Sequence, residues 1–165
     1  MAEEFKVPFA LSDKERYEVL LPQIKILLSK DDLLLSNLSN FTAALKQTFE
    51  KISWVGFYLF DGEKLYLGPF QGKVACTKIV LGKGVCGTSA LNKETIIVGN
   101  INNFPGHIAC DDGSNSEIVV PILKGTELIG VLDLDSYQFN AFDETDRKNL
   151  EDLCKFLAQE IFVNR

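Results

Sequence analysis

The spacing of apolar residues changes twice along this chain, and that change limits the possible folds more than any single motif does. Toward both ends the apolar residues recur at three- and four-residue intervals, which is typical of amphipathic helices. Between about residues 53 and 136 the spacing shortens to strand-like alternation, broken by turn-forming residues. Helices at both ends of a series of hairpin-connected strands predict an α+β fold, with helices packed on an antiparallel sheet.

The individual elements can be placed from these patterns. The helices are expected at about residues 12–30, 31–51, 85–92 and 143–163. The strands are expected at about residues 53–60, 64–68, 74–80, 95–98, 118–123 and 127–135. Asp61-Gly62 and Lys124-Gly125 are predicted hairpin turns. Pro22 is expected to kink the first helix, and residues 69–72 to interrupt the sheet after its second strand.

Length and charge exclude several classes of function. A chain of 165 residues with 46% hydrophobic content can bury one sizeable core, so a single domain is expected. The net charge of −6, without a basic block, argues against a surface that binds nucleic acid or an anionic membrane. The N-terminus is acidic and lacks the apolar run of a secretory signal, so a cytoplasmic location is expected.

The cysteines indicate redox chemistry rather than structural cross-links. None of the four forms the close pair typical of a zinc site, and a reducing compartment disfavours structural disulfides. No metal or organic cofactor is therefore implied. Cys154 lies on the apolar stripe of the last predicted helix, so we expect it to be a core residue. Cys76, Cys86 and Cys110 lie in loop-like surroundings, although Cys86 could simply pack behind a glycine-rich turn.

The segment from Asn103 to Glu117 is the strongest candidate for chemistry. It places His107, the single histidine of the chain, three residues before Cys110 in a loop rich in turn-forming residues. Loops on a rigid scaffold often carry function, and a reactive thiol needs nearby polar groups. Two interpretations of His107 remain open: it could pair with Cys110, or it could hydrogen-bond a loop carbonyl.

Six short motifs follow one another along the chain. They are Gly-Pro-Phe-Gln-Gly at 68–72, Ala-Cys-Thr at 75–77, Gly-Lys-Gly-Val-Cys-Gly at 82–87, Phe-Pro-Gly-His-Ile-Ala-Cys-Asp at 104–111, Ser-Glu-Ile-Val-Val-Pro at 116–121 and Leu-Asp-Leu-Asp-Ser at 132–136. In this order they resemble the free methionine-(R)-sulfoxide reductases, which are GAF-domain enzymes. The resemblance runs from the first helix to the last, and the combination is far more specific than any one motif.

The resemblance implies a fold, an activity and partners. The fold is a single GAF domain over residues 1–165, with a six-stranded antiparallel sheet flanked by N- and C-terminal helices. The activity is thioredoxin-dependent reduction of free L-methionine-R-sulfoxide, and the assembly is a homodimer through the terminal helices. By position, Cys110 matches the catalytic cysteine, Cys76 the resolving cysteine and Cys86 an auxiliary one. The pocket residues implied in the same way are Glu117, Asp133, Asp135, Trp54 and Tyr66.

These residue types suit the reduction of a sulfoxide. A thiolate attacks sulfur and becomes a sulfenic acid, which a second thiol then captures. The departing oxygen needs a general acid with a raised pKa, and we assign this role to Glu117. Asp133 and Asp135 point to the same face of a strand, with Leu134 toward the core, so both can receive the substrate's ammonium group.

Other interpretations of the same residues remain. The two aspartates could be a solvated strand end that prevents aggregation, and Trp54 and Tyr66 could be ordinary core residues. At the level of function, a GAF domain could be a ligand or redox sensor without turnover, since a fold does not determine an activity. A peroxide-reducing or thiol-relay protein could use Cys110 and Cys76 alone. A peroxide relay should tolerate the removal of Glu117, whereas a sulfoxide reductase should not.

Overall fold

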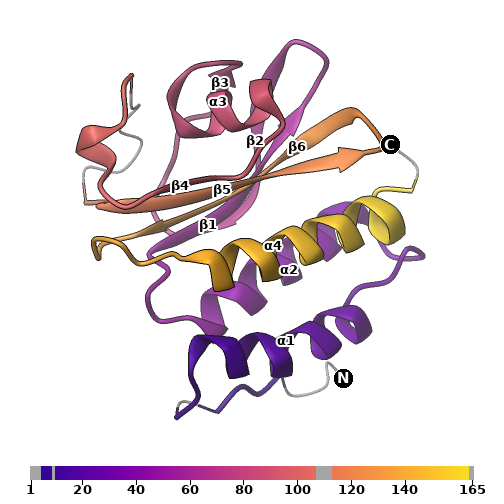
Figure 1. Ribbon diagram of the computed structural model, residues 1–165. Helices are drawn as coiled ribbons and strands as arrows, with labels where there is room; N and C mark the ends of the chain where they lie inside the picture. Colours follow the sequence, from indigo (N-terminus) through magenta and orange to yellow (C-terminus); the bar gives the residue numbers. More distant parts are fainter. Residues whose placement is uncertain (1–4, 9, 107–112, 164–165) are drawn as a thin grey trace.

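A computed structural model describes residues 5–8, 10–106 and 113–163. In these ranges the strands form a six-stranded, entirely antiparallel sheet with the order β3-β2-β1-β6-β5-β4 (Figure 1). The strands are β1 (Trp54–Phe60), β2 (Lys64–Gln71), β3 (Lys78–Val80), β4 (Ile96–Val98), β5 (Ser116–Lys124) and β6 (Glu127–Ser136). The helices are α1 (Asp13–Leu27), α2 (Leu34–Thr48), α3 (Gly84–Asn92) and α4 (Glu144–Phe156), and α4 continues as a π-helical turn over Leu157–Ile161. The predicted α+β class and the six-stranded sheet are confirmed.

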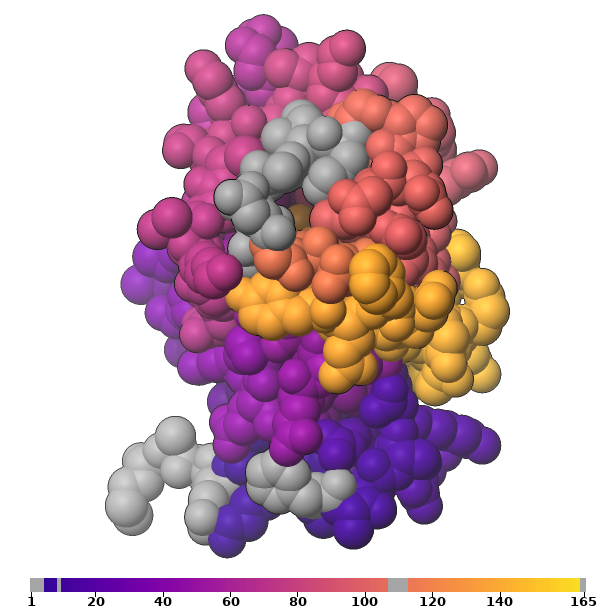
Figure 2. All heavy atoms as spheres, turned by 90° about the vertical axis from the view of Figure 1, so that its left-hand side faces the viewer, coloured from indigo at the N-terminus to yellow at the C-terminus, as the bar shows by residue number. Residues whose placement is uncertain are grey.

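The helices divide the molecule into layers. α2 and α4 lie on one face of the sheet, α1 packs outside them, and α3 lies on the opposite face (Figure 1). Figure 2 shows the same order from another side, with the indigo residues of α1 at one end and the pink residues from β2 to α3 at the other. Each face of the sheet therefore has its own apolar core. None of the helices in the described ranges is long and apolar enough to cross a membrane.

Alternation along β1 shows how the sequence separates these two cores. Val55 and Phe57 are buried on the side of α2 and α4, whereas Trp54 and Tyr58 are buried on the side of α3. Successive side chains of a strand point to opposite faces, so one apolar run can supply both cores. The α3 side also carries the polar residues described below.

The helix boundaries follow the capping residues. Ser12 and Glu15 form a capping box at the start of α1, and Asp143 and Asp146 form another at the start of α4. α1 continues through Pro22 to Leu27 and ends slightly earlier than the pattern predicted.

The prediction that residues 69–72 interrupt the sheet is wrong. β2 runs to Gln71, and Phe70 pairs with Gly56 of β1 beyond an irregularity in the register. Pro69 is tolerated because β2 pairs with β3 only at its first residues, so the proline lies where β2 is an edge strand. The predicted strand over 74–80 is shorter than expected, since β3 contains only Lys78–Val80.

An ion-pair network that is buried at Asp146 joins α1 and α4 to the segment before β1. Lys51 Nζ lies 2.6 Å from Asp13 Oδ2 and 2.8 Å from Asp146 Oδ2. The Asp146 carboxylate also accepts a hydrogen bond from the Tyr17 hydroxyl at 2.9 Å, and its side chain is only 1% exposed. Burial, followed by the negative charge of Asp146, raises the pKa of Tyr17 well above its usual value. The hydroxyl therefore stays protonated and available as a donor at neutral pH.

Candidate active site

A cavity that is partly open to solvent lies on the α3 face of the sheet. Its aromatic wall is formed by Trp54 and Tyr58 of β1, and residues 74–75 border it on one side. The polar residues that line it are Lys83, Cys86, Ser114, Glu117, Asp133 and Asp135. A cavity with an aromatic wall and a few converging polar groups is the usual form of a small-molecule site.

Three carboxylates reach this cavity from one β-hairpin. Glu117 of β5 pairs directly with Asp135 of β6, and Asp133 precedes Asp135 by two residues on the same strand. Both aspartates line the cavity, whereas Leu134 between them is buried in the core on the helix side. This arrangement confirms the orientation predicted from strand alternation. Asp133 is 6% exposed, so the interpretation of the two aspartates as a solvated strand end does not hold for it, whereas Asp135 is half-buried.

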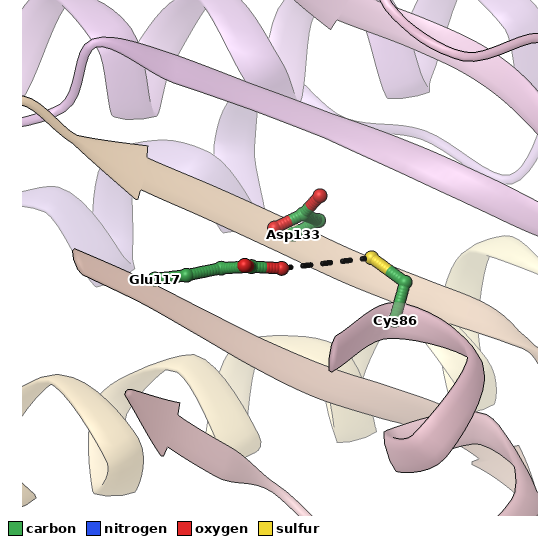
Figure 3. A group of neighbouring side chains, drawn as sticks. All are labelled: Cys86, Glu117 and Asp133. Carbon is green, nitrogen blue, oxygen red and sulfur yellow. Dashed lines mark hydrogen bonds between the residues drawn. The ribbon is translucent and has the colours of Figure 1, made fainter. Parts of the chain in front are cut away.

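Cys86 of α3 completes a compact cluster with Glu117 and Asp133 (Figure 3). Its thiol hydrogen-bonds to Glu117 Oε1, with 4.0 Å between Cys86 Sγ and the oxygen. One sulfur or oxygen atom from each of the three side chains lies within 4.8 Å of the others. We call these three residues the thiol-carboxylate cluster. No side chain of a lysine, arginine or histidine belongs to it in the part of the chain that the structure describes.

The environment of the cluster favours protonated carboxyl groups. Burial, and then the negative charges of Asp133 and Asp135, raise the pKa of Glu117 well above its usual value. Burial raises the pKa of Asp133 to about 6, against the opposing effect of hydrogen bonds from Cys86 and Glu117. Near neutral pH the pair can therefore hold one proton on Glu117 and a negative charge on Asp133. That division supplies an acid and an anion side by side.

One oxygen of this pair lacks a partner. Asp133 Oδ1 is buried and makes no hydrogen bond within the described residues. An unpaired buried carboxylate oxygen costs about 1–3 kcal/mol or more, so such atoms usually have a partner. Asp133 Oδ1 therefore marks the place where a ligand with a hydrogen-bond donor or a positive charge fits.

Cys86 is a free thiol held in its protonated form. Burial, together with the charges of Asp133 and Glu117, raises its pKa well above the usual value. A thiol of this kind is a weak nucleophile at neutral pH. The auxiliary redox role predicted for Cys86 stays a prediction, and its position beside Glu117 is the observed fact. Cys154 is free and buried, as its helical stripe predicted.

The aromatic wall also anchors the segment that carries Cys76. The Trp54 indole Nε1 donates to the carbonyl oxygen of Lys73 at 3.0 Å, and the Tyr58 hydroxyl donates to that of Cys76 at 3.0 Å. Trp54 stacks on Phe70 and on Tyr58, with ring centroids 5.4 Å and 6.1 Å apart. Sequence reasoning missed Tyr58. Its even spacing from Trp54 along the same strand was the signal that could have found it.

The expectation that Tyr66 lines the pocket is corrected by the structure. Leu65 and Leu67 belong to the core on the α3 side, so alternation directs Tyr66 to the other face of β2. Tyr66 is 40% exposed and is not among the described residues that border the cavity. The tyrosine that borders the cavity in the described residues is Tyr58.

The redox cysteines are described only in part. Cys76 is in a disulfide bond. Cys110 and His107 lie outside the described residues, so their predicted roles as nucleophile and neighbour stay predictions.

Tyr58→Phe is expected to loosen the Cys76 segment. The substitution removes the hydroxyl that donates to the Cys76 carbonyl, and the loss of one such bond costs about 0.5–1.5 kcal/mol. Hydrogen exchange measured by mass spectrometry should increase in a peptide covering residues 72–77. Tyr66→Phe is the matched control, because that ring is off the cavity. Equal exchange in the two variants would contradict an anchoring role for Tyr58.

Comparison with known proteins agrees with this geometry. The family described as "GAF domain" matches residues 34–161, so the fold is that of the GAF class. "GAF domain-containing protein A" of Dictyostelium discoideum is 51% identical, over 95% of this chain and 99% of its own length. "Free methionine-R-sulfoxide reductase" of Escherichia coli is 41% identical, over 90% of both chains. A solved structure of a free methionine-R-sulfoxide reductase from Neisseria meningitidis "in complex with its substrate" has a TM-score of 0.88 and 43% identity, over 94% of both chains. The chain therefore belongs to the GAF-domain family of free methionine-R-sulfoxide reductases.

Proposed function

We propose that this protein reduces free L-methionine-R-sulfoxide to methionine. The observation that carries the proposal is the unpaired oxygen of Asp133, buried beside a carboxyl group whose pKa is well above its usual value. An amino-acid substrate has an ammonium group for the first and a sulfoxide oxygen for the second. The aromatic wall of Trp54 and Tyr58 offers an apolar surface to the substrate's side chain.

In the proposed reaction Cys110 is the nucleophile. Its thiolate attacks the substrate sulfur and the sulfoxide oxygen takes up a proton. The bond between that oxygen and the substrate sulfur then breaks, the hydroxyl group transfers to the Cys110 sulfur as a sulfenic acid, and methionine leaves with the electron pair on its own sulfur. The thiol of Cys76 then attacks the sulfenic sulfur, which forms a disulfide and releases water. The dithiol of thioredoxin reduces that disulfide and returns both cysteines to the thiol form. The disulfide state of Cys76 supports its place in this cycle.

In this proposal Glu117 donates the proton to the departing oxygen, because its raised pKa keeps it protonated near neutral pH. Asp133 and Asp135 bind the ammonium group of the free amino acid. A methionine sulfoxide residue within a protein has no such group, so binding it would leave the buried Asp133 Oδ1 without a partner. Sites of this kind can reject an analogue by about 10⁴-fold.

The proposed partners follow from chemistry and surface. Thioredoxin is the proposed reductant, since a disulfide must be reduced in each cycle. The N-terminal helical layer exposes Ile26, Leu33 and Leu35, which are 75%, 77% and 67% exposed. These side chains support a homodimer through the terminal helices, and light scattering coupled to size-exclusion chromatography measures the mass that decides it.

Turnover is expected with the free R epimer alone. Consumption of NADPH, with thioredoxin and thioredoxin reductase, should be measured for the free R epimer, the free S epimer and a peptide-bound sulfoxide. Cys110→Ser should abolish turnover because it removes the nucleophile. Cys154→Ala is the matched control, since this thiol is buried away from the cavity. Binding of a small ligand without turnover of any sulfoxide would instead favour a sensor.

A further inference from the structure

The thiol-carboxylate cluster has a composition that substrate binding alone does not account for. An ammonium group is held by carboxylate oxygens, yet a free thiol from α3 lies among those oxygens (Figure 3). Cys86, Glu117 and Asp133 come from a helix and two strands, so the fold itself brings them together. All three are buried, at 4%, 5% and 6% exposure.

The spacing of the three side chains suits a small divalent cation. Zinc binds thiolate sulfur at about 2.3 Å and carboxylate oxygen at about 2.0–2.2 Å, which places neighbouring ligand atoms of a tetrahedral site roughly 3.5 Å apart. The sulfur of Cys86 lies 4.0 Å from Glu117 Oε1, and one ligand atom of each residue lies within 4.8 Å of the others. Small side-chain movements would therefore bring all three into coordination distance.

A second observation indicates that this site suits a cation. Asp133 Oδ1 is buried and has no hydrogen-bond partner within the described residues. The cationic side chain that borders the cavity in this part of the chain is Lys83, which is exposed. The buried end of the cavity is thus rich in groups that can release a proton to a cation, and it has an oxygen available for coordination.

We propose that the thiol-carboxylate cluster also binds a thiophilic divalent cation of the zinc class, in the place of the ligand's ammonium group. The thiolate selects such a cation over Mg²⁺ and Ca²⁺, which prefer oxygen ligands alone. Three protein ligands leave a fourth position for water, the arrangement of an accessible rather than a closed site. Binding of the cation excludes the amino acid, so the cation is an inhibitor and takes no part in the reaction.

The test is a titration of the protein in its disulfide form, without added reductant. In this form the free thiols of the described residues are Cys86 and Cys154, so a sulfur-to-metal charge-transfer band has few possible sources. Cd²⁺ serves as the spectroscopic probe and Zn²⁺ as the calorimetric one, with Mg²⁺ as the control cation. We expect one Cd²⁺ per chain with a charge-transfer band, and competition by added methionine.

Variants identify the ligands. Cys86→Ser should abolish the charge-transfer band and weaken Zn²⁺ binding at least about 10-fold. Removing a group that only hydrogen-bonds a metal ligand already lowers metal affinity by about 10-fold, so the loss of a ligand itself should cost no less. Asp133→Asn should weaken binding of both cations, and Cys154→Ala should leave it unchanged. A charge-transfer band that survives in Cys86→Ser, or the absence of stoichiometric binding, would overturn the proposal. Neither result depends on turnover, so the proposed reductase activity stands or falls separately.

Discussion

Glu117→Gln should lower kcat/KM for free methionine-R-sulfoxide by about 10²- to 10⁴-fold, the usual contribution of a general acid. The amide occupies the same volume and keeps a hydrogen-bond acceptor for Cys86, but it has no acidic proton to donate to the departing oxygen. The thioredoxin-coupled assay measures the loss. Glu127→Gln, at the exposed start of β6, is the matched control and should retain full activity. Near wild-type turnover in Glu117→Gln would assign the proton donor elsewhere.

The same variant should become more stable at neutral pH. The pKa of Glu117 is raised in the folded protein, so between its usual value and its folded value the native state binds more protons than the unfolded state. Stability contributed by such a group is present below the usual pKa and declines as pH rises through that window. Glu117→Gln removes the penalty, so its melting temperature should exceed that of the wild type at pH 7 and match it near pH 4. Lost activity in a more stable protein would exclude misfolding as the cause.

Lys51→Met should lower the free energy of unfolding by about 3–5 kcal/mol, the usual result of breaking a buried ion pair. Asp146 would keep the hydrogen bond from Tyr17 but would lose its cation while remaining almost fully buried. Asp13 and the carbonyl of Ala141 would lose the same Nζ group. Urea unfolding at pH 7 measures the change.

Lys64→Met is the control for this stability measurement. Lys64 pairs with Glu63, but the two side chains are 32% and 78% exposed, so solvent screens the pair. Surface pairs contribute about 0–1 kcal/mol. Lys51→Met could also lose less than about 1 kcal/mol of unfolding free energy. The attraction within the ion-pair network would then do no more than offset the hydration that its charges lose on folding, and the network would not hold α1 and α4 to the segment before β1.

The features that the sequence predicted best were those that depend on the spacing of apolar residues along a helix or strand. The β5–β6 hairpin, the helical stripe that buries Cys154, and the division of Asp133 and Asp135 from Leu134 all follow from local alternation. The motifs added the family, which the comparisons confirm. They also gave a position to Cys86, but the contact between Cys86 and Glu117 joins residues 31 apart and depends on tertiary packing.

The errors of the prediction come from packing between strands. The end of β2 was placed too early because a proline normally stops a strand, whereas here the irregular pairing with β1 carries the ladder past it. Tyr66 was assigned by its place in the chain, but the face of β2 on which it lies depends on the pairing of that strand. Tyr58 was overlooked although its even spacing from Trp54 indicated the face of β1 that it shares; its hydrogen bond to the Cys76 carbonyl depends on tertiary packing.

The pairing of Glu117 with Asp135 also protects the fold against misalignment of its own strands. A shift of one residue between β5 and β6 would move a strand's whole set of side chains to the opposite face of the sheet. Carboxylates would then enter the apolar layer beneath α2 and α4, where no ligand could compensate the cost of burying their charge. The carboxylates that line the cavity thus raise the free energy of the shifted register. Selection for catalysis therefore also selects the correct alignment of β5 and β6.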